Sequence, residues 1–343
     1  MTTRRLSSGP ECETSPSQVK DLLAAFSRVR VLVVGDLLAD QYVYGETERV
    51  SREAPVLIVR HELDEVKLGG GANAAANARS LGAKVTALGV IGQDPVGEQM
   101  VSLFSEQGIR SRVVRRFGVV TETRTRILAG GVSTTRQQML RIDRGATGPL
   151  EPKARAALAS LIRTEARRAD VVMVSDYGAG VLCDETRAAL AEVGLRVPVC
   201  VDSRSQLAAY KGVAVMKPNE PELAALTGLP VKSEPELLAA ARLALKRLDS
   251  RFLLVTRGRR GMALFEKGAP PRLIPVHGNA EAVDVTGAGD TVGAAFAVAL
   301  GAGASAGQAA ELANLAGALV VQKPGTATVS REELVGELAR EPQ

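Results

Sequence analysis

A glycine-rich octapeptide in the last quarter of the chain has the residue types of a phosphate-binding turn with a base beside it. It reads Asp284-Val285-Thr286-Gly287-Ala288-Gly289-Asp290-Thr291. The small residues 287–289 let a ligand approach the backbone closely, and the apolar run 292–300 predicts a helix. The N–H groups at such a helix start attract phosphate. Asp290 could accept a proton from an attacking hydroxyl group, or could simply cap the helix.

This octapeptide is not a Walker loop, because no Lys-Ser or Lys-Thr follows its glycines. Four further motifs precede it: Gly69-Gly70-Gly71-Ala72-Asn73 followed by Asn77, Gly92-Gln93-Asp94-Pro95-Val96-Gly97, Lys217-Pro218-Asn219-Glu220-Pro221-Glu222, and Thr256-Arg257-Gly258-Arg259-Arg260-Gly261. In this order, the five motifs resemble those of the ribokinase (PfkB) family of sugar kinases over residues 28–335. A dinucleotide-dependent dehydrogenase is disfavoured, since the first glycine motif lacks the third glycine of that fingerprint.

Within this family the chain is most similar to the D-glycero-beta-D-manno-heptose-7-phosphate kinase branch. The similarity is carried by Val33-Val34-Gly35-Asp36, Asp40, Tyr42, Val50-Ser51, Glu53-Ala54-Pro55, Thr123-Arg124-Thr125-Arg126, Gln137-Gln138, Arg141, Asp143, Ser175-Asp176-Tyr177-Gly178, Val292 and residues 325–329. It implies that ATP phosphorylates the anomeric oxygen of a heptose 7-phosphate to give the 1,7-bisphosphate. The nucleotidyltransferase half found in bifunctional members of this branch is missing from the sequence.

Three positions depart from the branch. Glu122 and Ala179 stand where lysine is expected, and Asp202-Ser203-Arg204 stands where Asp-Pro-Lys is usual. Arg204 and the arginines between residues 110 and 144 would then have to hold the substrate phosphate, since arginine grips phosphate bidentately. Two alternatives stay open: a kinase for another sugar or sugar phosphate, for example a hexose, and a catalytically silent sugar- or nucleotide-binding relative.

The resemblance also assigns roles to single residues. Asp290 is the expected base, and the amides of Gly287, Ala288 and Gly289 stabilise the transferring phosphoryl group. The remaining assignments are Asp36, Asp40, Gly70, Gly71, Asn73, Arg124 and Arg141 for the sugar; Asn219, Thr256, Gly258, Gly261 and Asn314 for ATP; Glu222, with Asn219, for Mg²⁺; and Asp284 and Thr286 for a monovalent cation such as K⁺. Several have structural alternatives: helix capping for Asn219 and Glu222, packing for Asn77 and Asn314, and a strand end for Asp36.

Strand and helix patterns alternate along the chain and predict the scaffold that positions these residues. Buried strands are expected at 29–34, 85–90, 171–174, 197–201 and 252–255, and helices at 72–81, 152–169, 234–248 and 287–300. This alternation predicts an α/β fold with a parallel central sheet covered by helices on both faces, and the family resemblance implies that the fold is ribokinase-like. Segments near 42–59 and 112–143 break the rhythm and predict antiparallel strands of a small β-sheet lid. Residues 1–27 are expected to form a tail and a short helix, and 28–338 a single kinase domain.

The composition excludes several other classes. The 343 residues carry a formal net charge of only +5, with 3% aromatic residues and no tryptophan, which argues against a nucleic-acid partner. Cys12, Cys183 and Cys200 have no metal or disulfide spacing. No apolar run is long enough to span a membrane and no signal peptide is visible, so we expect a cytoplasmic protein without a membrane partner. A homodimer through the lid is a further expectation.

Overall fold

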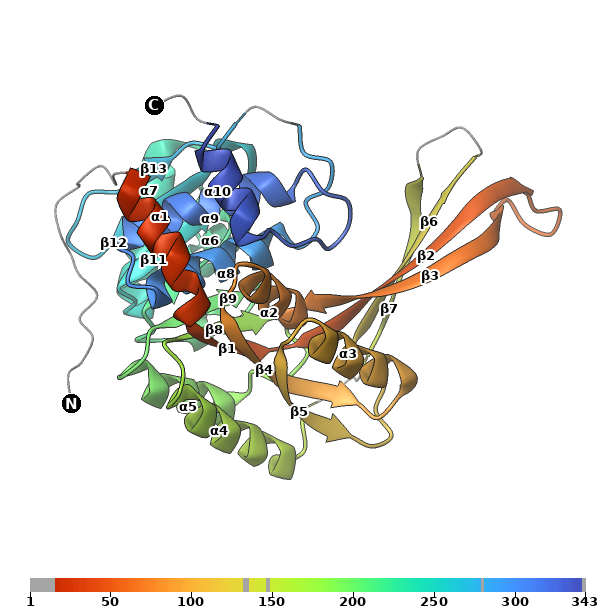
Figure 1. Cartoon of the computed structure of the whole chain (residues 1–343), viewed down its shortest axis with the longest axis horizontal. Coiled ribbons are helices and arrows are strands. Elements are labelled where there is room, and N and C mark those ends of the chain that lie inside the picture. Colours follow the sequence, from red (N-terminus) through yellow and green to blue (C-terminus); the bar gives the residue numbers. More distant parts are fainter. Residues whose placement is uncertain (1–15, 132–135, 146–148, 279–280, 341–343) are drawn as a thin grey trace.

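The computed structural model describes residues 16–131, 136–145, 149–278 and 281–340. Its centre is a sheet with strand order β13-β12-β11-β10-β9-β8-β1-β4-β5 (Figure 1). In chain order these strands are β1 (Arg30–Gly35), β4 (Lys84–Gly92), β5 (Arg110–Arg116), β8 (Val171–Asp176), β9 (Val199–Ser203), β10 (Val215–Met216), β11 (Phe252–Thr256), β12 (Met262–Glu266) and β13 (Arg272–Ile274). Neighbours from β11 to β5 run parallel, whereas β12 and β13 are antiparallel.

Helices cover both faces of this sheet, because its strands are apolar on both sides. In β1, Val31 and Val33 enter one core cluster while Leu32 and Val34 enter the other. The first cluster is closed by α1 (Pro16–Ala25), α2 (Gly71–Ser80), α3 (Pro95–Glu106), α8 (Ala288–Gly301), α9 (Ala306–Val320) and α10 (Arg331–Leu338), and the second by α4 (Pro152–Ala166), α5 (Asp184–Gly194), α6 (Glu220–Thr227) and α7 (Glu234–Leu248). The predicted parallel sheet between two helical layers is confirmed.

A second sheet projects from this body as an arm (Figure 1). It has the strand order β3-β2-β6-β7 and consists of β2 (Leu37–Val50), β3 (Leu57–Gly70), β6 (Thr123–Gly130) and β7 (Gln137–Arg144). We call this sheet the lid. Its presence confirms the predicted second, smaller sheet.

Three details of the lid differ from the sequence prediction. Strands β2 and β3 extend beyond 42–59 at both ends, β2 pairs with β6 in parallel, and residues 112–116 do not join the lid. They belong to β5 at the edge of the main sheet, which is in parallel register with β4. The reason is physical: strand-like alternation reveals that a segment is extended, but the choice of sheet depends on its distant partner.

The expected tail falls largely on residues 1–15, including Cys12, which lie outside the described residues; helix α1 and the short 3₁₀ turn 26–28 follow. Over the described ranges, no helix has both the length and the apolar character needed to cross a bilayer.

Candidate active site

The carboxyl ends of the parallel strands bring polar residues from distant parts of the chain to one edge of the sheet. Asp36 follows β1, Asp176 ends β8, Asp202 lies in β9 and Lys217 follows β10. Helix α8 packs against this sheet, and its first turn starts from Gly287, which has a left-handed φ of 77°. Such an edge is where ligands bind in open α/β sheets.

Asp290 is the third residue of α8 and its side chain is buried, with 2% of the residue exposed. Its carboxylate accepts an N–H from Asn73 at 3.0 Å and the O–H of Tyr177 at 2.9 and 3.1 Å. Burial raises the pKa of Asp290 to about 7, and the nearby Asp202 charge acts in the same direction. Such a carboxyl can take up a proton at neutral pH. The helix-cap alternative is wrong, because Gly287 is the N-cap.

Tyr177 lies in one of the segments that carry the branch similarity, but no role in the site was predicted for it. Besides its hydrogen bonds to Asp290, its ring lies under two guanidinium groups, with Arg124 Cζ at 4.7 Å and Arg204 Cζ at 4.1 Å from the ring centroid. Burial and the Asp290 charge raise the pKa of Tyr177 well above its usual value, so its hydroxyl keeps its proton and remains a donor. The available signal was its position directly after the strand-ending Asp176.

Asn73 is held in place by a short polar chain inside the body. Asn77 Nδ2 donates to Asn73 Oδ1 at 3.1 Å, and Thr291 Oγ1 donates to Asn77 Oδ1 at 2.9 Å. The Asn73 oxygen is thereby occupied, which turns its amide nitrogen toward Asp290. These contacts give Asn77 a structural part, since it orients the Asn73 side chain.

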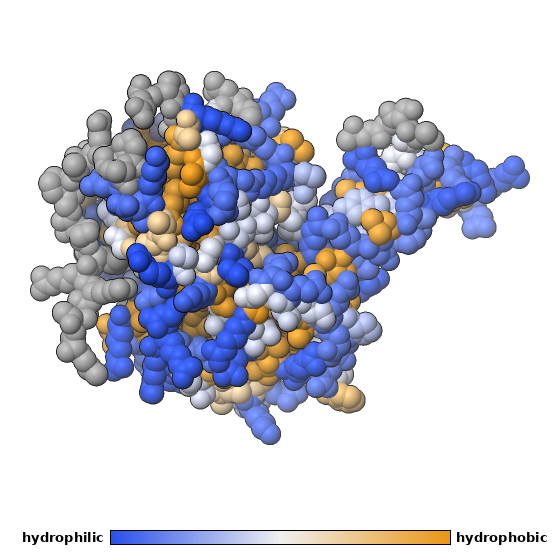
Figure 2. Space-filling model, viewed as in Figure 1, coloured by the Kyte–Doolittle hydropathy of each residue, from blue (hydrophilic) through white to orange (hydrophobic). Residues whose placement is uncertain are grey.

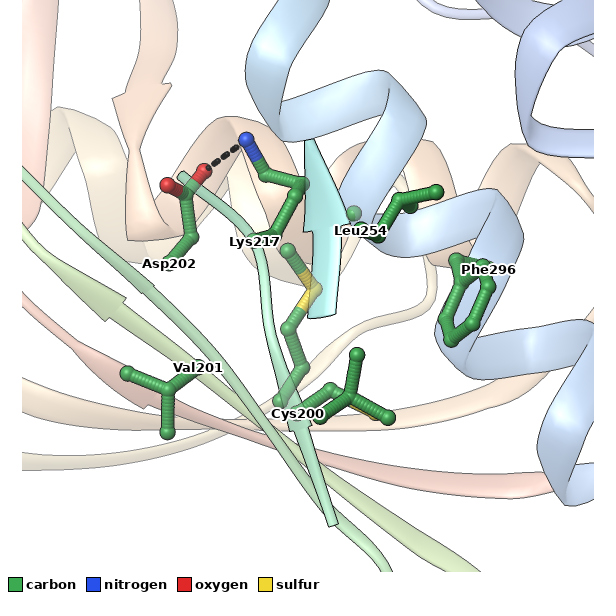
Figure 3. A pocket seen from close by; sticks show the side chains of 9 residues that line it. Cys200, Val201, Asp202, Lys217, Leu254 and Phe296 are labelled. Atoms are coloured by element: carbon green, nitrogen blue, oxygen red, sulfur yellow. Dashed lines mark ion pairs between the residues drawn. The ribbon is translucent and has the colours of Figure 1, made fainter. Parts of the chain in front are cut away.

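A buried ion pair stands next to the glycine-rich turn. Lys217 Nζ lies 2.9 Å from Asp202 Oδ2, and the two groups point toward each other at the rim of a small apolar cavity of about 10 Å³ (Figure 3). A Cβ atom placed on Gly289 would lie 3.5 Å from the same ammonium nitrogen. Burial acts to lower the pKa of Lys217, but Asp202 raises it above its usual value, so the ammonium stays charged. The sequence motifs had given neither residue a catalytic part.

The residues predicted for the sugar lie where the lid joins the body. Asp40 is buried, and its Oδ1 accepts from Arg126 Nη1 at 2.5 Å. A Cβ atom on Gly69 would lie 2.6 Å from Asp40 Oδ2, so only glycine leaves room for this carboxylate. Gly70 starts α2 with a φ of 53°. The sugar-binding roles of Asp40, Gly70 and Asn73 remain predictions.

Both carboxylate oxygens of Asp36 accept hydrogen bonds from the backbone. Its carboxylate accepts the backbone amides of Tyr177, Ala179 and Val181 at 2.8, 3.0 and 3.2 Å. Its own backbone oxygen accepts the amide of Gly71 at 2.9 Å. Asp36 therefore ties the loop after β8 to the start of α2, which positions Tyr177.

A pocket of about 690 Å³ opens beside the Tyr177 ring. It is lined by Leu38, Glu122, Arg124, Asp143, Arg144, Gly145, Pro149 and residues 177–180. Arg124 is half-buried there, whereas Arg141 is exposed on β7 and bound to Asp143 at 2.7 and 2.6 Å. The two positions where lysine was expected, Glu122 and Ala179, both line this pocket.

Comparison with known proteins agrees with this arrangement. Residues 29–333 match the family model described as pfkB family carbohydrate kinase. The chain belongs to this family of kinases. It is 39% identical to a D-beta-D-heptose 7-phosphate kinase of Bordetella bronchiseptica over 91% of this chain and 96% of the relative. It is also 37% identical to the bifunctional protein HldE of Geobacter sulfurreducens over 93% of this chain and 65% of that protein, so it spans about two thirds of such bifunctional relatives.

Solved structures confirm the ribokinase-like fold of this pfkB family member. The ribokinase of Arabidopsis thaliana complexed with ribose and ATP superposes with a TM-score of 0.71 at 24% identity, covering 92% of this chain and 99% of that one. Phosphofructokinase-2 from Escherichia coli in complex with substrates and products gives 0.74 at 17% identity, covering 91% and 99%.

The residues predicted for the nucleotide lie around the ends of β10 and β11. Thr256 ends β11 and its amide donates to Pro218 O at 3.0 Å, beside Asn219. Gly258 has a φ of 55° with open space around it, whereas a Cβ on Gly261 would lie 2.1 Å from a backbone oxygen. Asn314 donates to Pro275 O at 2.7 Å from within α9. Their contacts with ATP remain predictions.

Asn219 and Glu222 form a complete capping box at the start of α6. Asn219 Oδ1 accepts the Glu222 amide and Glu222 Oε2 accepts the Asn219 amide, both at 2.8 Å. The helix-capping role of these two residues is therefore present. Glu222 nevertheless keeps a second carboxylate oxygen for another partner. Burial raises the pKa of Glu222, and the charge of Asp202 adds to this, so two carboxylates influence each other here.

Asp284 and Thr286, predicted for a monovalent cation, form a turn beside the lid. Asp284 accepts the amides of Thr286 at 2.9 Å and Gly325 at 2.8 Å. Both residues line a larger groove between body and lid, of about 1030 Å³, which also contacts Tyr42 and Arg126. Among the described residues, no group of three or more acidic, histidine or cysteine side chains forms a ready-made metal site.

Proposed function

We propose that this chain transfers the γ-phosphoryl group of ATP to the anomeric hydroxyl of D-glycero-beta-D-manno-heptose 7-phosphate and so forms the 1,7-bisphosphate. The observation that carries the chemistry is the buried Asp290 carboxylate, with a pKa of about 7, at the start of α8. The name of the Bordetella relative supports the substrate. A kinase for another sugar or sugar phosphate would carry out the same chemistry and would differ only in the substrate bound on the lid side of the site.

The reaction follows from where the charges lie. Asp290 takes the proton of the sugar hydroxyl as its oxygen forms a bond to the γ-phosphorus. The bond between that phosphorus and the β,γ-bridging oxygen breaks, and its electron pair leaves with ADP. The Lys217 ammonium lies beside Gly289 of the glycine-rich turn, and residues 287–289 of this turn are the ones expected to stabilise the negative charge of the transferring phosphoryl group.

Mg²⁺ fits this edge of the sheet as a companion of the ATP phosphates. Magnesium keeps several waters and uses one or two carboxylates together with phosphate oxygens, so a preformed cluster is not required. Glu222 offers one half-buried carboxylate oxygen with the Asp202 charge nearby, and Asn219 lies in the same box. When bound, the ion neutralises charge on the phosphates. Asp284 and Thr286 would hold a monovalent cation such as K⁺ through oxygen atoms of their turn.

The substrate phosphate needs cations, and the expected lysines at 122 and 179 are replaced. Arg124 and Arg204 lie on the same tyrosine ring, next to the pocket of about 690 Å³. Each guanidinium can grip a phosphate in a bidentate manner. We assign the 7-phosphate to these two arginines, and give Arg141, which is already bound to Asp143, a lesser part.

Steady-state kinetics with matched sugars tests the proposal. ADP release is measured with heptose 7-phosphate, free heptose, and a hexose with and without its phosphate. We expect kcat/KM for heptose 7-phosphate to exceed that for free heptose by about a hundredfold, since charge-assisted bonds contribute about 1.5–3 kcal/mol each. A higher value for a free sugar would refute the phosphosugar substrate. No turnover with any sugar, together with tight ATP binding, would favour the silent relative.

We also propose a homodimer through the lid. Large apolar side chains are exposed along its strands and tip: Val50, Val56, Leu57, Leu63, Met139, Leu140 and Ile142. Figure 2 shows apolar patches among polar residues on the arm. Exposed apolar surface of this kind marks contact sites. Light scattering of the protein and of a Leu140→Asp variant would test the idea, with a monomeric wild-type protein refuting it.

A further inference from the structure

Two arginines stack on the tyrosine beside the base, whereas three arginines of the lid bind carboxylates. Three arginines of the lid are paired: Arg126 with Asp40, Arg136 with Glu62 and Arg141 with Asp143. Within the described ranges, neither Arg124 nor Arg204 forms an ion pair; each instead stacks on Tyr177. Burial, and then the charge of Arg204, lowers the pKa of Arg124, while Tyr177 and Asp40 act in the opposite direction, so two positive charges are held close together on one ring. An anion placed between them would relieve this repulsion.

The tyrosine on which these arginines stack, Tyr177, covers the carboxylate of the base Asp290. Its hydroxyl donates to both carboxylate oxygens of Asp290, at 2.9 and 3.1 Å, and only 2% of Asp290 is exposed. A sugar hydroxyl must reach the same oxygens before its proton can be taken. The backbone amide of Tyr177 is fixed by Asp36 at 2.8 Å. Opening therefore requires the tyrosine side chain to turn rather than the loop to move.

We propose that Tyr177 is a gate over Asp290, and that an anionic group on the sugar opens it by drawing Arg124 and Arg204 away from the tyrosine ring. The exchange is favourable, because a charge-assisted contact between guanidinium and phosphate is stronger than the stacking of a guanidinium on an aromatic ring. The pocket beside the ring, of about 690 Å³, leaves room for the arriving group. Glu122 and Asp143 also line the pocket, so the anion must lie nearest the guanidinium groups on the tyrosine ring.

The consequence is a selection for sugar phosphates that acts on turnover as well as on binding. A free sugar can enter the site but leaves the Tyr177 hydroxyl bound to Asp290, so the sugar hydroxyl is not deprotonated. The same closure keeps water from Asp290 while ATP is bound without sugar. This inference rests on the proposed function, and Tyr177 acts in it as a positioning residue.

The experiment separates the anion from the sugar. Free heptose is supplied with ATP, and inorganic phosphite is added as a detached anion. We expect phosphite to raise the wild-type kcat for free heptose about tenfold in a saturable way, within the usual range for coupling between two sites. In Tyr177→Phe, which keeps the ring and removes the hydroxyl, free heptose should already turn over near the activated rate, with phosphite adding less than about twofold.

Two controls keep the test decisive. Arg204 is exposed, so Arg204→Ala should fold normally and should lose the phosphite effect. Tyr44→Phe, a lid tyrosine that bonds Glu65, should behave as wild type. An equal loss of kcat for both substrates in Tyr177→Phe, with no phosphite effect in wild type, would overturn the gate. Failure of wild type to phosphorylate heptose 7-phosphate, with phosphite activating another sugar, would overturn the proposed substrate and support the gate.

Discussion

The ammonium of Lys217 lies 2.9 Å from the carboxylate of Asp202, and this pair stands directly beside Gly289 in the turn that leads into α8. The two residues come from the ends of neighbouring strands, β9 and β10. Their side chains are 9% and 18% exposed, so the pair is largely shielded from water. The pair therefore places a positive charge beside the glycine-rich turn, with a carboxylate to compensate it.

Removing one partner of this pair should destabilise the fold, and removing both should not. Lys217→Met or Asp202→Asn alone leaves a buried charge, at a cost of about 3–5 kcal/mol. The double variant buries no charge and should regain most of the thermal stability, which differential scanning calorimetry would measure. Because Lys217 faces the glycine-rich turn, the double variant should nevertheless have a lower kcat. Equal stability of all four proteins would contradict this account.

Replacement of Asp290 by asparagine should separate binding from chemistry. Asparagine keeps the shape and still accepts the hydrogen bond from Asn73, but it cannot take a proton. We expect kcat to fall by about 10² to 10⁴, the usual contribution of a positioned base, with ATP affinity unchanged by calorimetric titration. Turnover within about threefold of wild type would leave Asp290 without a role as base.

The raised pKa of Asp290 predicts a pH profile with a definite sign. The base works only when ionised, so log kcat should fall with a slope of one as pH drops below about 7. Folding shows the opposite trend: because the folded pKa lies above the unfolded one, this group makes the protein less stable as pH rises from about 4 to 7. Asp290→Asn should flatten both dependences. A kcat profile level down to pH 5 would contradict the assignment.

The sequence sufficed for the scaffold because its signals are local. Runs of buried β-branched residues marked the central strands, and the octapeptide 284–291 marked a helix start. The contact between Tyr177 and Asp290 was not predicted, because the two residues are 113 positions apart in the sequence and nothing local to either residue reveals it. Residues 112–116 were recognised as extended but placed in the wrong sheet, because their partner β4 is specified only by tertiary packing.

Replacing Gly287 tests whether the glycine-rich turn requires glycine at this position. Its φ is 77°, and a Cβ atom there would lie 2.6 Å from the Asn73 nitrogen that holds Asp290. Gly287→Ala should therefore cost about 1 kcal/mol or more in stability and displace Asn73, lowering kcat at least tenfold. Gly268→Ala is the matched control, since Gly268 has a φ of 85° and no atom within 4 Å. Similar kcat values in both variants would show that only backbone strain matters.

Glu222 allows the metal role to be separated from the capping role. Glu222→Gln keeps an oxygen for the Asn219 amide, so the capping box and the melting temperature should be preserved. Glutamine carries no charge and binds Mg²⁺ weakly, so the Mg²⁺ concentration for half-maximal activity should rise about tenfold. Glu236→Gln, at the equivalent position of the capping box of α7, is the control and should leave the Mg²⁺ dependence unchanged. If Glu222→Gln melts early but titrates with Mg²⁺ as wild type does, the carboxylate serves the helix alone.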